Sequence, residues 1–413
     1  MEEYTNHISE PKEKVLHLGT FFFLYIAQSI PMSFFSTAIQ VLMRESDFSL
    51  SSIAMLQIIK LPWVLKFLWA PLVDKQCRTM ADYKRFIISS ELLYAGLIFI
   101  VAWLDLSTNF LLVITLIVLS LIASATQDIA TDALAVRLFE REDKSLLNSM
   151  QSMGSFGGTL VGGGVLLLIL SLYGWKIVLS CLALFVLLAI IPLMFRQNKP
   201  LRARSEKVKV HWADFAYFFA QRGIWKQVLF LVLYYGGIVG TLSILRPYLV
   251  DSGYSLKEIG FMSGVVGTFT AFLASFLSGL IVKRVGIGKA RILFAGLIVF
   301  CALVFAYCSR IAVTTFMIYA MIMLLWGSYG MATVVVYTSS MECVRTGREG
   351  TDFTVQTVIT HLMGIVIAVL SGRIADLWGY SGLFYVEVFL ATLSFVYVCW
   401  LGRKERVLSH KTD

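Results

Sequence analysis

The sequence predicts an all-α membrane protein with twelve transmembrane helices, arranged as two pseudo-symmetric six-helix halves with both termini in the cytoplasm. Of the 413 residues, 58% are hydrophobic and only 15% are charged, whereas soluble chains are about 45–50% apolar and about 25% charged. Apolar stretches of about 20 residues recur along the chain, and each can cross a hydrocarbon core of about 30 Å. The expected spans are residues 16–43, 52–73, 86–104, 110–136, 146–171, 176–195, 226–249, 256–282, 291–309, 311–339, 353–375 and 382–402.

The positive charge of the chain follows this topology. There are 35 Lys and Arg residues against 26 Asp and Glu, and most of the basic residues fall in segments that are cytoplasmic if the N-terminus is inside. Cytoplasmic loops of membrane proteins are enriched in Lys and Arg, so this asymmetry predicts that both termini are inside. The net charge of +9 is thereby explained, and no nucleic-acid partner is expected.

The widest gap between spans divides the chain. Residues 1–195 form the expected N-terminal six-helix half, 196–225 a basic cytoplasmic linker, and 226–413 the C-terminal six-helix half. The end of the linker, residues 211–225, is rich in aromatic side chains, which predicts a helix at the membrane interface. A linker with a membrane anchor is the favoured interpretation; a regulatory or partner-binding segment is the alternative.

The two halves share residues at a constant sequence offset. Gln151 corresponds to Gln356, and Gly174 corresponds to Gly379. This correspondence indicates a duplicated six-helix unit. Three glycines of the fifth span recur at four-residue spacing, at Gly154, Gly158 and Gly162. Small residues at this spacing predict a close approach of another helix.

Four charged side chains stand out inside the second and fourth predicted spans: Lys60 and Lys66 in the second, and Asp128 and Asp132 in the fourth. An ionisable side chain in hydrocarbon costs a few kcal/mol or more, so such residues face a protein interior or an aqueous cavity and mark ion or substrate pathways. Lys66 and Asp128 lie equally far from the inner ends of their spans, and Asp132 shares a helix face with Asp128. We expect Lys66 to pair with Asp128 or Asp132, either for proton coupling or as a fixed link between helices.

The remaining candidate site residues are less strongly marked. Lys60 has no carboxylate at its own depth, so it is the candidate contact for an anionic solute. A lysine that pairs with backbone carbonyls or snorkels outward is the alternative. His361, near the middle of the eleventh span, is a candidate proton carrier, and a hydrogen-bonded packing role fits it equally well. The other candidate solute-binding residues are polar or aromatic: Tyr25, Gln28, Gln57, Trp63, Tyr234, Tyr235 and Tyr329. Singly each is typical of packing, and together they indicate a bulky amphipathic solute.

Signatures of enzymes, cofactors and metals are missing from the sequence. There is no GxxxxGK[ST] or HExxH motif, and no segment outside the spans is large enough for a catalytic domain. The six cysteines are scattered without CxxC spacing, so neither a metal site nor a disulfide is expected. A secondary transporter, driven by an ion gradient or by the gradient of its solute, is therefore predicted; a membrane receptor or scaffold is the alternative from another class.

Two segments resemble a known signature. Residues 70–75 (APLVDK) and 279–286 (GLIVKRVG) are degraded copies of G-x-x-x-D-R-x-G, which is typical of the major facilitator superfamily after its second and eighth spans. The resemblance implies the major facilitator fold. Asp74 is then the candidate conformational latch, with the basic loop residues Arg78 and Arg85 as partners. The second copy has Lys in place of Asp, so a latch is expected on one side only.

Two further strings resemble one branch of that superfamily. KFLWAPLVD (residues 66–74) and SATQDIATDA (residues 124–133) are similar to the branch that contains the AmpG muropeptide permeases, the acetyl-coenzyme A transporters and the RhtX/FptX siderophore importers. The string YIAQSIPMSFF (residues 25–35) and the twelve-span length resemble the siderophore importers more closely. Lys60 does not belong to the AmpG pattern. The resemblance implies a monomeric, proton-coupled importer in the inner membrane of a Gram-negative bacterium. A siderophore or iron chelate is the favoured solute, and an anhydro-muropeptide is the alternative.

Overall fold

The computed structural model describes residues 11–45, 59–106, 108–198, 201 and 210–409, and every regular element in these ranges is a helix. The chain forms two compact units. The first comprises Met1–Ala220 with Val344–Val358, and the second comprises Gln221–Cys343 with Ile359–Asp413. The boundary after Ala220 falls inside the predicted linker. Residues 344–358, which the sequence places in the C-terminal half, pack with the first unit.

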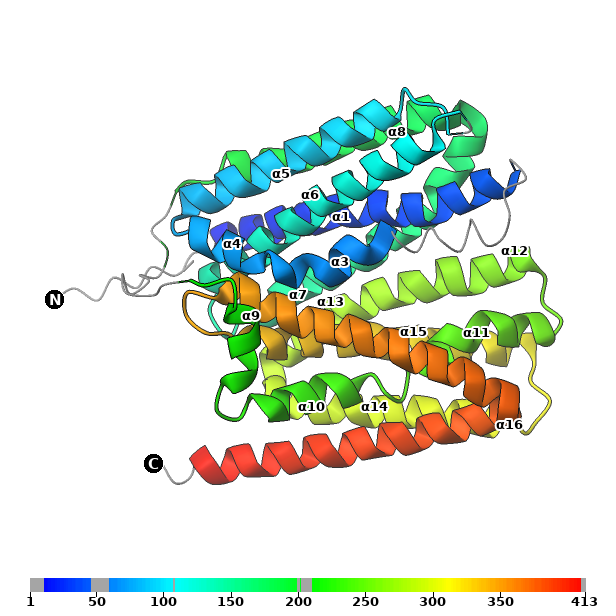
Figure 1. The fold of residues 1–413 in the computed structure, drawn as a ribbon. Helices are drawn as coiled ribbons and strands as arrows, with labels where there is room; N and C mark the ends of the chain where they lie inside the picture. The colour runs from blue at the N-terminus through cyan, green and yellow to red at the C-terminus, as the bar shows by residue number, and fades with distance from the viewer. Residues whose placement is uncertain (1–10, 46–58, 107, 199–200, 202–209, 410–413) are drawn as a thin grey trace. The chain divides into compact units, whose positions relative to one another are not determined.

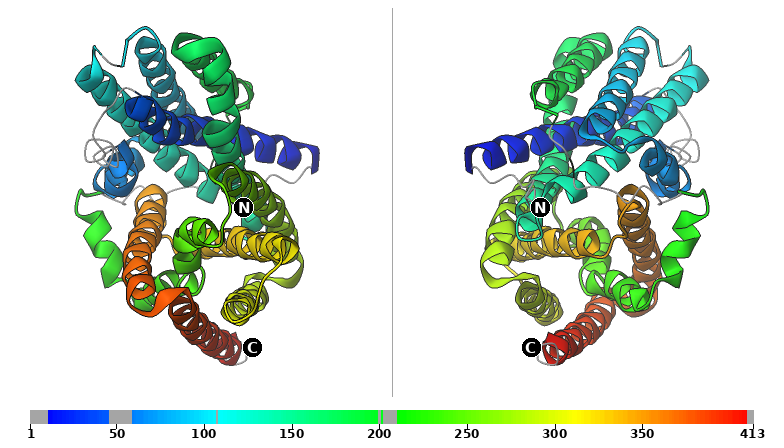
Figure 2. Two further views of the ribbon diagram at one scale, coloured as in Figure 1. Left: turned by 90° about the vertical axis from the view of Figure 1, so that its right-hand side faces the viewer. Right: turned by 90° about the vertical axis from the view of Figure 1, so that its left-hand side faces the viewer.

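The first unit is built from long helices and one broken one. Helix α5 packs against α6 and α8, and the three run side by side in both Figure 1 and Figure 2. The helices of this unit are α1 (Pro11–Glu45), α3 (Leu61–Leu65), α4 (Ala70–Gln76), α5 (Met80–Val101), α6 (Phe110–Leu138), α7 (Lys144–Leu160), α8 (Leu166–Met194) and α9 (Asp214–Tyr217). Helix α9 and the 3₁₀ turn Phe218–Ala220 occupy part of the predicted interfacial helix.

The second predicted span is interrupted. Helix α3 ends at Leu65, a 3₁₀ turn covers Lys66–Leu68, and α4 begins at Ala70. Pro62 lies in the first turn of α3 and Pro71 in the first turn of α4. Proline fits a first helical turn, because its missing N–H would have no intrahelical acceptor there. The turn between the two short helices positions the side chain of Lys66.

Helices α1 and α7 touch at the predicted glycines. A Cβ added at Gly154 would lie 2.7 Å from Tyr25 Cβ, and one added at Gly158 would lie 2.3 Å from Ser29 Cβ. At Gly162, just after α7, the added Cβ would lie 2.3 Å from the carbonyl oxygen of Ile30. The close helix approach expected from the glycine spacing is therefore present, and α1 is the partner.

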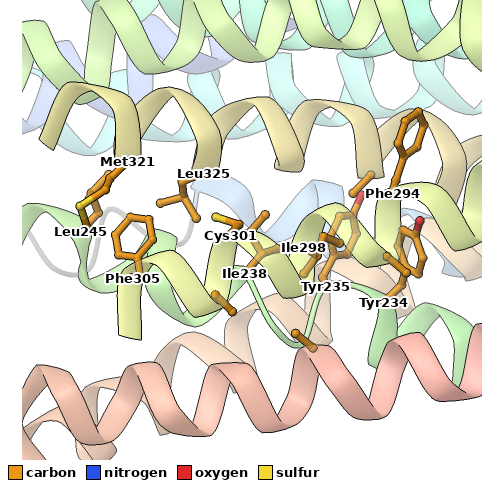
Figure 3. Close-up of a cluster of buried hydrophobic side chains, with 14 of the residues drawn as sticks. Tyr234, Tyr235, Ile238, Leu245, Phe294, Ile298, Cys301, Phe305, Met321 and Leu325 are labelled. Carbon is orange, nitrogen blue, oxygen red and sulfur yellow. The ribbon is translucent and has the colours of Figure 1, made fainter. Parts of the chain in front are cut away.

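The second unit surrounds one apolar core. Tyr235, Ile298 and Leu325 are among its buried side chains, and Figure 3 shows them between neighbouring helices. The helices are α10 (Ile224–Tyr234), α11 (Val239–Asp251), α12 (Leu256–Ile259), α13 (Thr268–Val285), α14 (Ile287–Cys308), α15 (Thr315–Glu342) and α16 (Glu349–Ser409, whose start belongs to the first unit). A π-helical segment, Gly260–Gly267, joins α12 to α13.

Two helices turn sharply at glycines with positive φ. Gly174 in α8 has φ 75°, and Gly379 in α16 has φ 69°. A side chain would be strained in this left-handed region, so glycine is required at both turns. The two residues are the pair that the sequence offset relates, and both turn the chain back on itself, as Figure 1 shows for α16. Among the described residues, eight helical segments are long and apolar enough to cross a membrane, and two of these, of 51 and 55 residues, contain the turns.

Candidate functional site

Lys66 and Asp128 form a buried ion pair. Lys66 lies in the 3₁₀ turn after α3, and its Nζ pairs with Asp128 Oδ2 on α6. The two side chains are 2% and 3% exposed. The Lys66 ammonium also lies 4.8 Å from the centre of the Trp63 ring, within cation–π distance. Two of the four charges singled out in the sequence are thus joined.

Asp132 lies one helical turn further along α6 and extends this group. Tyr25 Oη on α1 donates a hydrogen bond of 2.7 Å to Asp132 Oδ1, and Gln151 Nε2 on α7 donates one of 3.2 Å to the same oxygen. Asp132 is fully buried and interacts electrostatically with Asp128 and Lys66. One ammonium therefore faces two carboxyl groups. Like charges this close cannot both stay ionised without cost, so the arrangement can hold a proton.

Four helical segments converge on these side chains. α1 supplies Tyr25, the 3₁₀ turn supplies Lys66, α6 supplies both aspartates, and α7 supplies Gln151. The glycine contacts between α7 and α1 bring Tyr25 and Gln151 to the same aspartate. We call Lys66, Asp128, Asp132, Tyr25 and Gln151 the charge cluster. Sequence reasoning identified all of these residues except Gln151 as site candidates, and Gln151 was noted only for its place in the internal repeat.

Glu91 is a further buried carboxyl that the sequence reasoning left without a role. It lies on α5, is 0% exposed, and neither of its oxygens has a hydrogen-bond partner among the described residues. In the sequence it stands out as a lone charged residue in the apolar third span.

Gln28, a predicted solute contact, is 1% exposed, and its backbone carbonyl accepts a hydrogen bond of 3.5 Å from the hydroxyl of Tyr94 on α5.

The other solute-contact candidates are dispersed. Lys60 is exposed just before α3, and His361 is exposed on α16. Gln57 lies outside the described residues. Tyr235 and Tyr329 pack together in the second unit, with their ring centres 5.6 Å apart.

Tyr234 lies in the core of the second unit. It is 0% exposed, and its hydroxyl donates to the Arg291 carbonyl at 2.9 Å. Figure 3 shows it among the buried side chains. Its hydroxyl is therefore already engaged, and its predicted contact with a solute stays a prediction.

Asp74, the predicted latch residue, holds the first turn of α16. Its Oδ1 accepts a hydrogen bond of 2.9 Å from the Gly350 N–H, and its Oδ2 accepts bonds of 2.7 Å and 2.6 Å from the N–H and hydroxyl of Thr351. A carboxylate at a helix N-terminus is also favoured by the helix dipole. Burial raises the pKa of Asp74 to about 6, while the hydrogen bonds from Thr351 and Gly350 act in the opposite direction.

The predicted latch partners, Arg78 and Arg85, follow Asp74 closely in the sequence. The Arg137 guanidinium donates to the Arg78 carbonyl at 2.8 Å, and Arg85 acts electrostatically on Asp82. The contact with α16 was not anticipated, because residues 74 and 350 are far apart in sequence and no local pattern relates them. The roles of Asp74, Arg78 and Arg85 in conformational change stay predictions.

A second set of ionic contacts surrounds the start of α16. Arg345 donates to Asp352 through Nε at 2.8 Å and Nη2 at 2.6 Å, a bidentate arrangement that fixes geometry as well as charge. Its Nη2 also donates to the Asp214 carbonyl at 2.8 Å. Arg348 Nε lies 2.8 Å from Asp214 Oδ1. These bonds fasten the linker helix α9 to the segment that precedes α16.

Long apolar helices that enclose buried charges define a multi-pass membrane protein of the transporter type. Residues 19–368 match the family model for the Major Facilitator Superfamily. The chain belongs to this superfamily, as its signature segments predict. Members of the superfamily are transporters of small-molecule solutes.

Similar sequences point to one branch of the superfamily. The chain is 23% identical over 389 residues to an uncharacterized protein of Haemophilus influenzae, with 90% of this chain and 91% of the relative covered. It is 21% identical over 409 residues to the putative transporter AmpG 4 of Rickettsia conorii, covering 95% of this chain and 98% of the relative. It is 23% identical over 299 residues to the anhydromuropeptide permease of Escherichia coli K12, covering 71% of this chain and 60% of that permease. The predicted AmpG-containing branch is thereby confirmed.

Solved structures support the fold. The fucose:proton symporter FucP of Escherichia coli superposes with a TM-score of 0.70 at 16% identity, covering 94% of this chain and 98% of that one. A bacterial homologue of the iron transporter ferroportin, in an outward-facing state, superposes with a TM-score of 0.67 at 15% identity, covering 93% and 98%. At these identities the likeness concerns the fold alone.

Proposed function

We propose that the chain is a proton-coupled secondary active transporter that imports a bulky anionic solute across a bacterial inner membrane. The observation that carries the proposal is the charge cluster, in which one buried ammonium faces two buried carboxyl groups inside a transporter fold. A buried ion pair contributes little net stability compared with apolar side chains of the same volume. A role in transport explains why charges occupy these positions.

In the proposed mechanism the charge cluster binds one proton and releases it on the other side of the membrane. Asp132 and Asp128 share the excess negative charge, so a proton binds to this carboxyl pair while Lys66 stays paired with Asp128. Tyr25 and Gln151 donate to Asp132 Oδ1 and hold it in place. The cluster joins α1, α6, α7 and the turn before α4, so a change in its charge acts on all four segments. One charge crossing the membrane potential contributes about 2.3 kcal/mol per 100 mV.

Two solute classes fit the proposal. The relative named anhydromuropeptide permease favours an anhydro-muropeptide. The string at residues 25–35 favours a siderophore or another anionic iron chelate. Both classes are bulky and anionic, so Lys60 is the proposed contact in either case.

The proposed topology has twelve spans, cytoplasmic termini and a monomeric chain. The eight apolar helical segments support the count, because the two longest turn at Gly174 and Gly379 and so pass the membrane twice. Helix α5 has 22 residues, which is long enough for a further span. The predicted span at residues 52–73, which is interrupted at Lys66–Leu68, supplies the remaining one.

Uptake by a bacterial strain that lacks the gene tests the solute class. Cells expressing the chain would be offered labelled ferric siderophores and a labelled anhydro-muropeptide, with and without a protonophore. We expect one class to accumulate, the protonophore to abolish accumulation, and Lys60→Ala to reduce uptake at least tenfold. Lys257→Ala, at an exposed residue on α12, is the matched control and should leave uptake unchanged. Uptake that is insensitive to both Lys60→Ala and the protonophore would contradict the proposal.

A further inference from the structure

The second unit contains a broken helix whose gap is covered by another helix. Helix α10 ends at Tyr234 and α11 begins at Val239. A Cβ added at Gly237, inside the gap, would lie 2.3 Å from Ala391 Cβ on α16. The part of α16 that follows Gly379, which we call the second arm of α16, therefore packs directly against the gap between α10 and α11. No side chain caps the N-terminus of α11 by a hydrogen bond.

Glu387 lies one helical turn before Ala391 on the same arm and is directed at the first turn of α11. A Cβ added at Gly240 would lie 1.9 Å from Glu387 Oε1 and 2.3 Å from Ser371 Oγ. Only glycine leaves room for the carboxyl group here. Glu387 is 1% exposed, Ser371 Oγ lies 3.5 Å from its Oε1, and its Oε2 has no hydrogen-bond partner among the described residues.

Among the described residues, Glu387 has no ion-pair partner, and its Oε2 has no hydrogen-bond partner. Arg246, Arg373 and Asp376 on α11 and α16 are exposed at the surface, and the buried Arg291 of α14 donates to Ser339. The nearby tyrosines have other contacts: Tyr385 accepts from Arg310, Tyr380 donates to Asp251, and Tyr248 and Tyr235 pack against aromatic rings. An isolated carboxylate in an apolar interior is costly, and a bound proton removes that cost.

We propose that Glu387, with Ser371 and Gly240, forms a second proton-binding site, separate from the charge cluster and located in the second unit. This inference rests on the proposed proton coupling. Oε2 takes the proton, and Oε1 accepts from Ser371. When the proton leaves, the carboxylate is attracted by the partial positive charge at the N-terminus of α11. Protonation of Glu387 therefore weakens the attraction between α16 and the start of α11, next to the gap in the broken helix.

The position of the residue suits exchange with the outer side of the membrane. Glu387 follows the turn at Gly379 by eight positions, which corresponds to about 12 Å along the helix. Ser371 precedes that turn by the same number of positions. Under the proposed topology the turn lies outside, so this site receives protons from the side on which solute is taken up.

Infrared spectroscopy of the full chain in lipid nanodiscs, titrated without solute, tests the site independently of transport. We expect wild type to show a protonated-carboxyl band that disappears as pH rises. Glu387→Gln should remove the part of that band that belongs to this site and leave the contribution of the charge cluster, and Ser371→Ala should shift the titration of the part that Glu387 contributes. Asp376→Asn, at an exposed carboxylate, is the control and should leave the band unchanged. Superimposable spectra for wild type and Glu387→Gln would overturn the proposal.

Transport provides the second test. Accumulation driven by a pH gradient of one unit should fall about tenfold in Glu387→Gln, because one coupled proton supplies about 1.4 kcal/mol per unit. Solute exchange at equal pH needs no net proton transfer and should fall much less. A parallel loss of both activities would indicate a merely structural role for Glu387. Wild type that shows the infrared band but no gradient-driven accumulation would contradict the proposed function and leave the proton site standing.

Discussion

Lys66 shows why a buried charge is informative about function. Its ammonium is removed from water, and the contacts that compensate are Asp128 and the face of Trp63. Removing one partner of such a pair leaves an uncompensated charge and costs about 3–5 kcal/mol, whereas replacing both by apolar side chains is often neutral. Stability and transport therefore respond differently to single and double substitution.

We predict that Lys66→Met alone lowers the free energy of unfolding by about 3–5 kcal/mol. The double variant Lys66→Met with Asp128→Leu should recover most of that loss, because neither member of the ion pair is then left without the other. Neither variant should accumulate solute. Thermal unfolding in detergent, analysed as a double-mutant cycle, measures the coupling. A double variant that is less stable than either single variant, or that transports normally, would contradict this account.

Among single residues, the charged side chains inside spans were the ones that the sequence identified most clearly. Lys66, Asp128 and Asp132 are conspicuous because a hydrophobic span seldom contains a charge, and depth along the helices related them. The role of Gln151 was not predictable in the same way, since an amide inside a span is common and its bond to Asp132 depends on how closely α7 packs on α1. Gln57 lies outside the described residues, so its role stays a prediction.

Among the helices, the contact between α7 and α1 is set by glycines. The spacing of Gly154 and Gly158 predicted a close helix contact, but the sequence does not reveal which helix fills it. The structure assigns it to α1, with Ser29 facing Gly158. The interruption of the second span has only a partial signal in the sequence: Pro62 lies at its start, whereas the 3₁₀ turn at Lys66–Leu68 has no clear sequence signal.

Substitution of these glycines by alanine measures the contact. A Cβ at Gly158 would lie 2.3 Å from Ser29 Cβ and 2.8 Å from the Ser29 carbonyl carbon, so the two backbones must separate. We expect Gly158→Ala to destabilise the protein by about 1–3 kcal/mol, the usual cost of overpacking. Gly164→Ala is the matched control, because nothing lies within 4 Å of its added Cβ. Equal melting temperatures for the two variants would refute the tight contact.

The contact between Asp74 and α16 gives a defined pH dependence. The pKa of Asp74 is raised to about 6 by burial in this arrangement, and it would be about 3.9 in water. The folded protein, in which the pKa is higher, binds the proton more tightly than the unfolded chain does. Protonation of Asp74 therefore stabilises the fold at low pH, and this stabilisation is lost as pH rises through about 6.

We therefore expect the melting temperature of wild type to fall relative to that of Asp74→Asn between pH 5 and pH 7.5. Asp74→Asn has no titrating group at this position, so it supplies the reference at each pH. A difference between the two proteins that stays constant, or that grows with pH, would contradict the assigned environment of Asp74.

For the whole molecule, composition and span length were sufficient to predict an all-helical membrane protein, and the signature segments identified its superfamily. The internal offset correctly related the turns at Gly174 and Gly379. The packing of residues 344–358 with the first unit was not predictable. It depends on long-range bonds from Asp74 to Gly350 and Thr351, and from Arg345 and Arg348 to α9.

The most direct test of the central claim is proton movement driven by solute. Purified protein would be reconstituted into liposomes that contain a pH-sensitive dye, and the solute identified by the uptake experiment would be added outside without an imposed pH gradient. We predict that the lumen acidifies as solute enters, and that Lys66→Met with Asp128→Leu abolishes the acidification. Solute entry without any change in lumenal pH, or unchanged acidification in the double variant, would contradict proton coupling through the charge cluster.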